Sequence, residues 1–504
     1  MTRSSHPVCR AADVGESPGN EDRGAEATSG PLAPGHSDEA LRDQFIERHG
    51  QRFRRIIEYR DAFQAWVKLE NGLWSPDYPA FAQAVSDGCS EVGDWYRANG
   101  GPGGAKIDQA LKGGGKHYTV ERMLSKSPAL ATTLRQFDSV PYELNTPDFV
   151  VNLQDGTWRS HDTSDLFRLR TAVSPDFFGG PPERWLNNLA RLAGGQEWLI
   201  EVLQRWFGYM LTGYTDWQYM LFIPGPKGTG KSLLVRVLNE VMGSYAKQKN
   251  PEFWVLRKNQ DERFAYDDLA GIRGLLGTET LDNATWYETR IVQIADGDEL
   301  DVEFKGGAKR VIPSQAKITI AGNHEPAFPS GDREGGLTRR LMRLYIGSEH
   351  TLPSSDVDEH ILRDLIAEEG PRILAWLILG AIKALGEGRH RFRTLAEPLF
   401  AAAQTYVDEG DPRAQFIADR RIIPGDPDKD YIELTTVYKD YLHYRREDDP
   451  GFAERRSAFK NAMTDRFQWR WEMVRRGEPN KRKHGLAAAY GWKYRDLMEE
   501  PPEG

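Results

Sequence analysis

The chain has little cysteine, no apolar run of membrane length and no excess of positive charge. Its two thiols, Cys9 and Cys89, are too few for a disulfide scaffold or a four-cysteine zinc ribbon. The longest apolar run, residues 373–382, reaches about half the length of a membrane span. The formal net charge of -9 argues against a uniformly basic nucleic-acid coat, although a local basic surface remains compatible with it. We therefore expect a soluble, cytoplasmic protein with no membrane contact and no secretory signal.

What the chain does contain is apolar residues, at 39% of the total, in several distinct patterns. Residues 1–37 are polar and rich in Gly, Pro and Ser, and they are predicted to be a disordered tail. The rest is predicted to form an N-terminal α+β domain (38–180), a helical collar (181–217), an α/β core (218–350), a helical segment that closes the core (351–395) and a small C-terminal domain (396–504). Asn71-Gly72 predicts a hairpin turn, whereas the glycine-rich stretches 100–104 and 113–115 are expected to be loops.

One segment of the core carries a phosphate-binding pattern. The strand-like run 218–224 leads into Gly225-Pro226-Lys227-Gly228-Thr229-Gly230-Lys231-Ser232, which fits G-x4-G-K-[ST] at every fixed position. Glycines let backbone N–H groups curve around phosphate oxygens, and the following helix points its positive dipole end at them. Lys231 is expected to bind the β- and γ-phosphates, and Ser232 to ligate Mg²⁺. The segment therefore predicts a nucleoside triphosphatase that uses ATP and Mg²⁺.

Later strands of the core are expected to end in polar side chains. Glu279 follows a short apolar strand and is predicted to polarise the attacking water or to hold Mg²⁺ through water. Asn323 follows the apolar run 317–322, where it is either a sensor of the γ-phosphate or a turn-forming residue, and the sequence leaves both open. Arg339 and Arg340 precede another apolar strand, a position from which an arginine can stabilise transition-state charge on a neighbouring subunit's nucleotide.

A basic hairpin is predicted between Glu279 and Asn323. Residues 300–304 alternate in polarity, residues 305–310 form a glycine-containing turn and residues 311–312 return. Lys305, Lys309 and Arg310 bring positive charge to this turn, which suits contact with a phosphate backbone. A turn that is merely solvated would look the same in the sequence.

The order of these motifs resembles that of superfamily 3 helicases, specifically the phage and plasmid primase-helicase family that includes the poxvirus primase-helicases. The resemblance rests on the phosphate loop, on Glu279, and on residues 295–298, 321–326 and 339–341. It extends upstream through residues 144–153 and 204–213 and covers the chain from about residue 44 to residue 494.

The resemblance implies an AAA+-type core that assembles into a ring, usually a hexamer, and hydrolyses ATP while moving along single-stranded DNA. It implies Lys231, Glu279, Asn323 and Arg340 as the catalytic residues, because relatives place the interface arginine immediately before the apolar strand. The hairpin occupies the place where ring translocases carry a pore loop. A separate primase or polymerase is expected as a partner, because the chain has too few residues and cysteines ahead of the core for a primase module.

The C-terminal domain is predicted to carry a local basic surface. Between residues 454 and 484 Lys and Arg outnumber acids, with Phe467, Trp469 and Trp471 between them. In relatives this end looks like a winged-helix DNA-binding unit, which favours binding of duplex DNA. A solvated surface over aromatic core residues explains the same pattern.

These features favour an ATP-dependent DNA helicase of a phage, plasmid or integrated element. The alternative is a DNA-binding AAA+ ATPase that switches state at an origin or in defence without processive unwinding. A small-molecule phosphotransferase is disfavoured, because nothing resembles an acceptor-binding lid and the basic hairpin would have no purpose.

Overall fold

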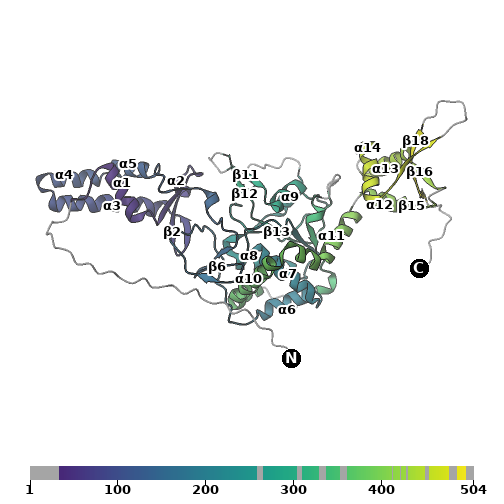
Figure 1. Cartoon of the computed structure of the whole chain (residues 1–504), viewed down its shortest axis with the longest axis horizontal. Coiled ribbons are helices and arrows are strands. Elements are labelled where there is room, and N and C mark those ends of the chain that lie inside the picture. Colours follow the sequence, from purple (N-terminus) through teal and green to yellow (C-terminus); the bar gives the residue numbers. More distant parts are fainter. Residues whose placement is uncertain are drawn as a thin grey trace.

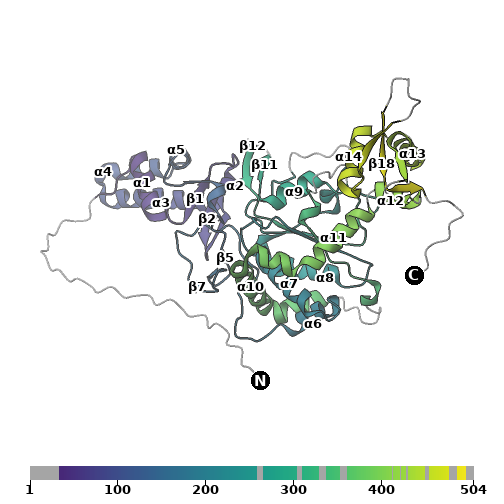
Figure 2. The ribbon, with the colours of Figure 1, turned by 45° about the vertical axis from the view of Figure 1, so that its right-hand side comes forward.

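The computed structural model describes residues 33–257, 265–303, 309–328, 336–351, 360–410, 412–420, 422–426, 429–448, 453–475 and 485–494. A helical N-terminal part, a central body built on a sheet and a small C-terminal unit follow one another along the longest axis (Figure 1). The turned view shows the same three parts (Figure 2). Residues 1–32 of the predicted tail lie outside the described residues. Its last residues are described and contact a helix, since the Tyr96 hydroxyl donates to the Pro34 carbonyl at 2.8 Å.

The N-terminal part has its own core, in which the Trp66 ring stacks on Phe81 with centroids 3.5 Å apart. Its helices are α1 (Asp38–His49), α2 (Ala62–Ala65), α3 (Tyr78–Asn99), α4 (Gly101–Leu111) and α5 (Gly114–Leu124). Its sheet has the order β3-β2-β1-β4, with β1 (Phe53–Ile56), β2 (Trp66–Glu70), β3 (Leu73–Pro76) and β4 (Ala131–Thr132). The hairpin predicted at Asn71-Gly72 is confirmed, because β2 pairs antiparallel with β3 across it.

The two glycine-rich stretches of this part are not loops as expected but the first turns of α4 and α5. The first N–H groups of a helix need no partner within the helix, so glycine and Pro102 are tolerated there. The connections between the helices are correspondingly short.

A small three-stranded sheet then joins the N-terminal part to the body. It has the order β5-β6-β7, with β5 (Glu143–Asn145), β6 (Val150–Asn152) and β7 (Trp158–Arg159). Leu144, Val151 and Leu153 are fully buried and belong to the same core as the collar helices and the central sheet. This segment, predicted as part of the N-terminal domain, therefore packs with the body.

The prediction of an α/β core is confirmed, and the structure shows that its sheet is parallel. The central sheet has the order β14-β8-β13-β10-β9, and every pair in it is parallel. Its strands are β8 (Met220–Pro224), β9 (Ala246–Gln248), β10 (Gly274–Gly277), β13 (Lys317–Gly322) and β14 (Leu341–Arg343). The strands β8, β10 and β13 are buried along their whole length, as expected when helices cover both faces of a parallel sheet.

Helices cover both faces of this sheet, and alternate residues of each strand face opposite cores. Leu221 and Ile223 pack with the collar and with the helices α8 and α10, whereas Met220 and Phe222 pack with α9 and α11. The helices are α6 (Glu183–Leu192), α7 (Glu197–Met210), α8 (Lys231–Met242), α9 (Glu288–Asp296), α10 (Ile361–Leu395) and α11 (Glu397–Glu409). Short 3-10 helices are η1 (Leu134–Gln136), η2 (Gly243–Tyr245), η3 (Pro251–Trp254), η4 (Thr338–Arg340) and η5 (Ser348–His350).

The collar helix α7 is buried over most of its surface because it packs closely against α10. Gly208 on α7 and Gly380 on α10 permit the approach, since a Cβ on Gly208 would lie 2.1 Å from the Ala381 nitrogen. The predicted helical collar therefore packs tightly against α10, the helix that follows the sheet.

A two-stranded hairpin and a C-terminal unit complete the fold. The predicted hairpin is formed by β11 (Glu299–Glu303) and β12 (Lys309–Pro313), but Lys309 and Arg310, which were expected in its turn, pair with Glu303 and Val302 in the second strand. The C-terminal unit contains α12 (Pro412–Asp419), β15 (Ile422–Pro424), β16 (Tyr431–Glu433), α13 (Leu434–Asp448), α14 (Arg456–Phe467), β17 (Trp471–Arg475), β18 (Gly485–Tyr490) and β19 (Trp492–Tyr494). Its own core includes Phe459, Met463 and Trp469.

Candidate nucleotide-binding site

The predicted phosphate loop joins the end of β8 to the start of α8, at the carboxyl edge of the central sheet. The strand β13 lies directly beside β8, and β10 lies on the other side of β13. Because all three strands are parallel, their carboxyl ends meet at the same edge, where open α/β sheets bind ligands. The residues that follow them, Ser232, Glu279 and Asn323, are therefore brought to one edge of the sheet.

The backbone of the loop turns at its glycines. Gly225, Gly228 and Gly230 have φ angles of 151°, 81° and 90°, which residues with a side chain rarely adopt. Gly230 precedes α8, and no side chain caps the start of this helix. The first N–H groups of α8 therefore remain available to an anion, as they are in phosphate-binding loops.

Lys231 and Asn323 are in direct contact across the two neighbouring strands. The Lys231 ammonium donates to the Pro226 carbonyl at 2.6 Å and to Oδ1 of Asn323 at 2.9 Å. Lys231 is 3% exposed, and burial lowers the pKa of its ammonium to about 8. Its two partners are neutral, so a phosphate would supply the negative charge that this buried cation lacks.

Glu279 is exposed two residues beyond β10. The next residue, Thr280, is tied to the segment after β13, because its hydroxyl donates to the His324 carbonyl at 2.6 Å and accepts from the His324 N–H at 3.1 Å. This pair fixes the segment that carries Glu279 beside the segment that carries Asn323. The carboxylate is thereby held at the edge of the sheet and remains accessible to water.

The side chains at this edge fit a magnesium–nucleotide complex. Ser232 lies half-buried in the first turn of α8. No group of three or more His, Cys, Asp or Glu side chains able to hold a metal occurs among the described residues. Mg²⁺ in nucleotide sites uses few protein ligands and takes the rest from phosphate oxygens and water, so one hydroxyl and one nearby carboxylate suit it.

Arg340 occupies a different environment from the one predicted. It is 2% exposed, and its guanidinium forms a two-pronged ion pair with Asp296 at the end of α9 and also donates to the Gly336 carbonyl. An arginine that acts on a neighbouring subunit must project from the surface, whereas this side chain is enclosed within its own chain. Arg339 is exposed and lines an open groove together with Arg393 and Phe400. The geometry thus favours Arg339, not Arg340, as the arginine available to a neighbour.

The predicted DNA-binding side chains are only partly described. Lys305 lies outside the described residues, and so do the side chains of Lys309 and Arg310, which begin β12. In the C-terminal unit, Arg455 and Arg456 are exposed at the start of α14, whereas Trp469 is fully buried. Trp469 is therefore a core residue and not a stacking platform.

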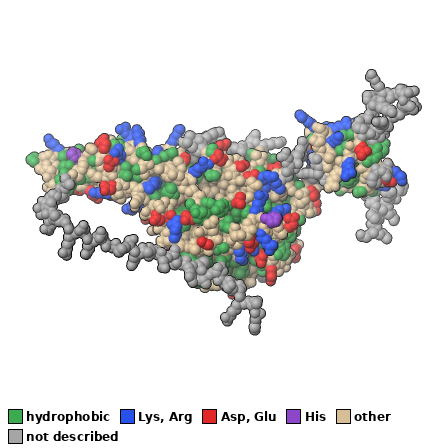
Figure 3. All heavy atoms as spheres, in the orientation of Figure 1, with side chains coloured by type: hydrophobic (Ala, Val, Ile, Leu, Met, Phe, Trp, Pro, Cys, Tyr) green, Lys and Arg blue, Asp and Glu red, His purple; other side chains and the backbone are tan. Residues whose placement is uncertain are grey.

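Lys and Arg side chains are interspersed with Asp and Glu over the face of the molecule shown in Figure 3. This distribution agrees with the net charge of -9 and with the absence of a uniform basic coat. Among the helices of the described part of the chain, none combines the length and the apolarity that crossing a membrane requires.

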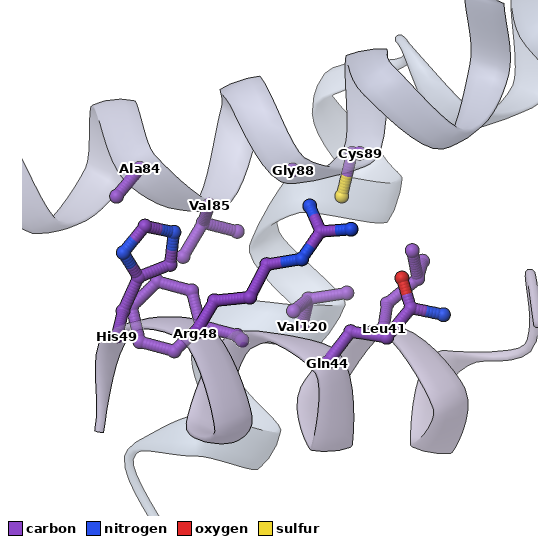
Figure 4. A pocket seen from close by; sticks show the side chains of 10 residues that line it. Leu41, Gln44, Arg48, His49, Ala84, Val85, Gly88, Cys89 and Val120 are labelled. Atoms are coloured by element: carbon purple, nitrogen blue, oxygen red, sulfur yellow. The ribbon is translucent and has the colours of Figure 1, made fainter. Parts of the chain in front are cut away.

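A small hollow in the N-terminal part is unrelated to the phosphate loop (Figure 4). It lies between α1, α3 and α5 and is lined by Phe45, Val85 and Cys89 among others. Burial raises the pKa of the Cys89 thiol to about 11, so the thiol stays protonated and unreactive at neutral pH.

Sequence reasoning missed one residue at the loop, Arg191 in the last turn of α6. Its Nη2 donates to the Thr229 carbonyl at 2.9 Å, and its Nη1 donates to the His350 carbonyl at 2.8 Å. In the sequence it resembles any basic residue near a helix C-terminus, a position that basic side chains commonly occupy. No local signal points from the collar to the loop, because the contact is made between segments 38 positions apart.

Comparison with known families divides the chain at the collar. Residues 42–204 match a family described as D5 N terminal like, and residues 223–340 match a family of unknown function, DUF5906. The first range ends within α7, and the second runs from β8 to Arg340 and so includes the loop, Glu279 and Asn323. The match of the first range fits a protein of the primase-helicase kind.

Solved structures of the apo C-terminal region of NrS-1 are also similar to this chain. Three of them share 12% sequence identity with it and each covers 90% of it. The chain in turn covers 99%, 98% and 98% of theirs, with TM-scores of 0.46, 0.46 and 0.45.

Proposed function

We propose that the chain is an ATP-dependent DNA helicase that acts as a ring translocase in the replication of a phage, plasmid or integrated element. The observation that carries this proposal is the contact of 2.9 Å between the Lys231 ammonium and Asn323, with Glu279 following the next strand of the same sheet. A cation, an amide and a carboxylate distant in sequence converge where parallel strands end. Hydrolysis of a nucleoside triphosphate needs these three groups together.

Each side chain at the edge has a role in this proposal. Lys231 neutralises the β- and γ-phosphates of ATP, and the Ser232 hydroxyl holds Mg²⁺, with Glu279 contributing through water. Bound Mg²⁺ supplies further positive charge against the phosphate oxygens. Glu279, exposed and held beside the sensor segment, orients and deprotonates the attacking water. Asn323 releases its contact with Lys231 and turns its amide to the γ-phosphate or to that water.

The proposed assembly is a homo-oligomeric ring, with a hexamer as the expected size, in which Arg339 reaches the nucleotide of the next subunit. Its exposure and its place beside Arg393 in an open groove support this role. A mixture of Arg339→Ala and Lys231→Ala subunits should regain hydrolysis that neither parent shows, because some interfaces then contain both intact halves. If the mixture stays inactive at every ratio while rings still form, Arg339 does not act in trans.

The proposed DNA contacts lie on two elements. In the sequence, the β11–β12 hairpin lies between β10 and β13, the strands that Glu279 and Asn323 follow. Its Lys305, Lys309 and Arg310 would contact single-stranded DNA in the ring. The C-terminal unit has the order α12, β15, β16, α13, α14, β17, β18 and β19, and the helix pair α13–α14 followed by the antiparallel pair β17–β18 supports a winged-helix-like unit. Its α14, with Arg455 and Arg456 exposed at its start, would contact duplex DNA.

The deciding experiment measures strand displacement on forked DNA beside DNA-stimulated ATP hydrolysis. A helicase shows both, and Lys305→Ala/Lys309→Ala should keep basal hydrolysis but lose DNA stimulation and unwinding. This double variant should also flatten the dependence of DNA affinity on salt, because fewer counterions are released. Stimulation without displacement favours a DNA-binding switch, and the absence of stimulation favours a phosphotransferase. Unwinding at the wild-type rate by the double variant would show that the hairpin is only a solvated turn.

A further inference from the structure

The collar helix α6 places two polar side chains against the phosphate loop. Arg191 and Asn188 lie three residues apart and so share one face of the helix. One guanidinium joins three segments, because it donates to Oδ1 of Asn188 at 3.0 Å, to the Thr229 carbonyl at 2.9 Å and to the His350 carbonyl at 2.8 Å. The contact with Thr229 lies within the phosphate-binding motif itself.

This contact acts on one N–H group of the phosphate cradle. The carbonyl of Thr229 and the N–H of Gly230 belong to the same planar trans peptide, so they point in opposite directions. A guanidinium that holds the carbonyl from behind therefore directs the N–H toward the inside of the loop and polarises it. Among the described residues the Gly230 N–H has no acceptor. A Cβ on Gly230 would lie 2.4 Å from Nη2 of Arg191, so glycine is also needed for the guanidinium to approach.

An amide donor without an acceptor and a cation without a carboxylate partner, both on α6, point to an anion as the missing partner. The amide nitrogen Nδ2 of Asn188 is buried and has no hydrogen-bond acceptor among the described residues. Its identity is set by the network, since the other amide atom, Oδ1, accepts from Arg191. The half-buried Arg191 guanidinium has no carboxylate within ion-pair distance in the described part of the chain, and burial lowers its pKa. A buried donor and a buried cation without a counterion are costly unless a ligand supplies an acceptor.

We propose that Asn188 and Arg191 form a collar-borne part of the nucleotide site. Arg191 is a positioning residue that holds the Thr229–Gly230 peptide for the β-phosphate of a nucleoside di- or triphosphate, and Asn188 directs its free amide donor at the bound nucleotide. This inference rests on the proposed nucleotide-binding function. On this proposal, nucleotide binding by the core requires α6, the collar helix that lies in the segment similar to the D5 N-terminal family.

The test measures ADP affinity by calorimetry in the full-length chain, together with the melting temperature without nucleotide. Asn188→Asp keeps the shape and the contact with Arg191 but replaces the amide donor with a carboxylate, which repels phosphate. It should weaken ADP binding by about tenfold or more, while the melting temperature stays the same or rises. Arg191→Met should weaken ADP binding to a similar extent. Arg191→Lys should restore part of the lost affinity, because lysine returns the positive charge but not the several N–H donors of the guanidinium.

Matched controls lie on the same helix. Asn187→Asp adds the same charge at the neighbouring exposed position, and Arg184→Met removes an arginine whose ion pair is with Glu368 on α10. Both should bind ADP within about twofold of the wild type, because neither side chain contacts the loop.

A purely structural tie predicts a different pattern. Asn188→Asp would then strengthen the contact with Arg191 and bind ADP as well as the wild type, and this result would overturn the proposal. Unchanged ADP affinity in Arg191→Met would overturn it as well. If the wild type binds ADP but does not unwind forked DNA, the helicase function fails while the binding measurements still decide the role of α6. If the wild type binds no ADP, both proposals fail.

Discussion

The two ends of the central sheet both hold buried cations, but among the described residues carboxylates act on them only at the amino end. At the amino end, Arg273 directly precedes β10 and is 0% exposed, and Lys317 begins β13 and is 2% exposed. At the carboxyl end, Lys231 is 3% exposed and contacts one carbonyl and one amide oxygen. Similar residue types at similar depth therefore serve different purposes, and their partners distinguish them.

The amino end offers its cations several carbonyl acceptors and two nearby carboxylates, Asp138 and Asp216. Arg273 donates to the carbonyls of Glu143 and Leu211 at 2.8 Å each, and the Asp138 carboxylate lies close enough to attract it. Lys317 donates to the carbonyls of Thr212 and Gln315. These bonds join the β5 segment, the end of the collar and the sheet. These bonds and the nearby Asp138 and Asp216 carboxylates stabilise the arrangement of the domains.

The carboxyl end is left incomplete. Lys231 and Arg191 have no carboxylate partner among the described residues, and Asn188 keeps a buried donor without an acceptor. The comparison teaches that a buried cation marks a candidate binding site when no carboxylate of the described residues acts on it. It predicts loss of activity from changes at the carboxyl end and loss of stability from changes at the amino end.

The largest expected effect is that of Lys231→Ala on ATP hydrolysis. Turnover should fall on the order of 100-fold or more, because the cation that faces the phosphates is removed. The melting temperature without nucleotide should not fall, since the variant also removes a desolvated charge. Lys227→Ala, at an exposed and non-fixed position of the same loop, is the control and should keep most of its activity. Normal turnover in Lys231→Ala would show that the carboxyl end of the sheet is not the site of ATP hydrolysis.

Glu279→Gln sharpens the comparison by separating binding from chemistry at the carboxyl end. The amide keeps the shape but cannot act as a base, so hydrolysis should fall on the order of 100-fold. ATP affinity should stay close to that of the wild type, as measured with a fluorescent analogue. Undiminished turnover would place the acidic residue of the site elsewhere in the chain.

Arg273→Met tests the amino end. The variant loses the hydrogen bonds of Arg273 and leaves the buried Asp138 carboxylate without the positive charge beside it, which should cost about 3 kcal/mol of stability. This appears as a lower unfolding midpoint in urea, whereas ADP affinity of the folded protein should change by less than about twofold. Arg184→Met, which removes a half-exposed ion pair with Glu368, should leave the midpoint nearly unchanged. A large loss of ADP affinity without loss of stability would contradict the division between the two ends.

The pH dependence of nucleotide binding gives a smaller effect. The pKa of Lys231 is about 8 in the free chain, and a phosphate would raise it, so binding at pH 8 should take up about half a proton. ADP affinity should therefore fall as the pH rises above 8. The number of protons follows from calorimetry in buffers of different ionisation enthalpy. Lys231→Ala should show no such uptake, and equal uptake in both proteins would exclude Lys231 as its source.

The smallest effect concerns Asp138 at the amino end. Burial raises its pKa to about 6, above the value of an unfolded chain, so the folded state binds the proton more tightly. The resulting stabilisation is complete below the unfolded pKa and is lost as the pH rises through 6. Between pH 5 and pH 7.5, Asp138→Asn should alter the pH dependence of unfolding by on the order of 1 kcal/mol. Identical pH profiles for the two proteins would mean that Asp138 keeps its ordinary pKa.

Local patterns predicted a large part of the fold and of the candidate site. The loop between β8 and α8, the strands that end before Glu279 and Asn323, and the β11–β12 hairpin all follow from short runs of residues. In each case the signal lies within one element, because strand periodicity and turn chemistry act over a few residues. The glycine-rich stretches at 100–104 and 113–115 show the limit of such signals, since glycine suits a helix start as well as a loop.

The sequence by itself predicted which residues are candidates for phosphate binding and that they follow strands. Only the tertiary structure decided which side chains are free to act. Arg339 and Arg340 are adjacent and chemically identical, but Asp296 on α9 encloses Arg340, and Arg339 remains exposed. Arg191 is ordinary in its own helix and gains significance from the Thr229 carbonyl. The reason is physical: the cost of burying a charge depends on the partners around it, and distant segments supply those partners only when the chain has folded.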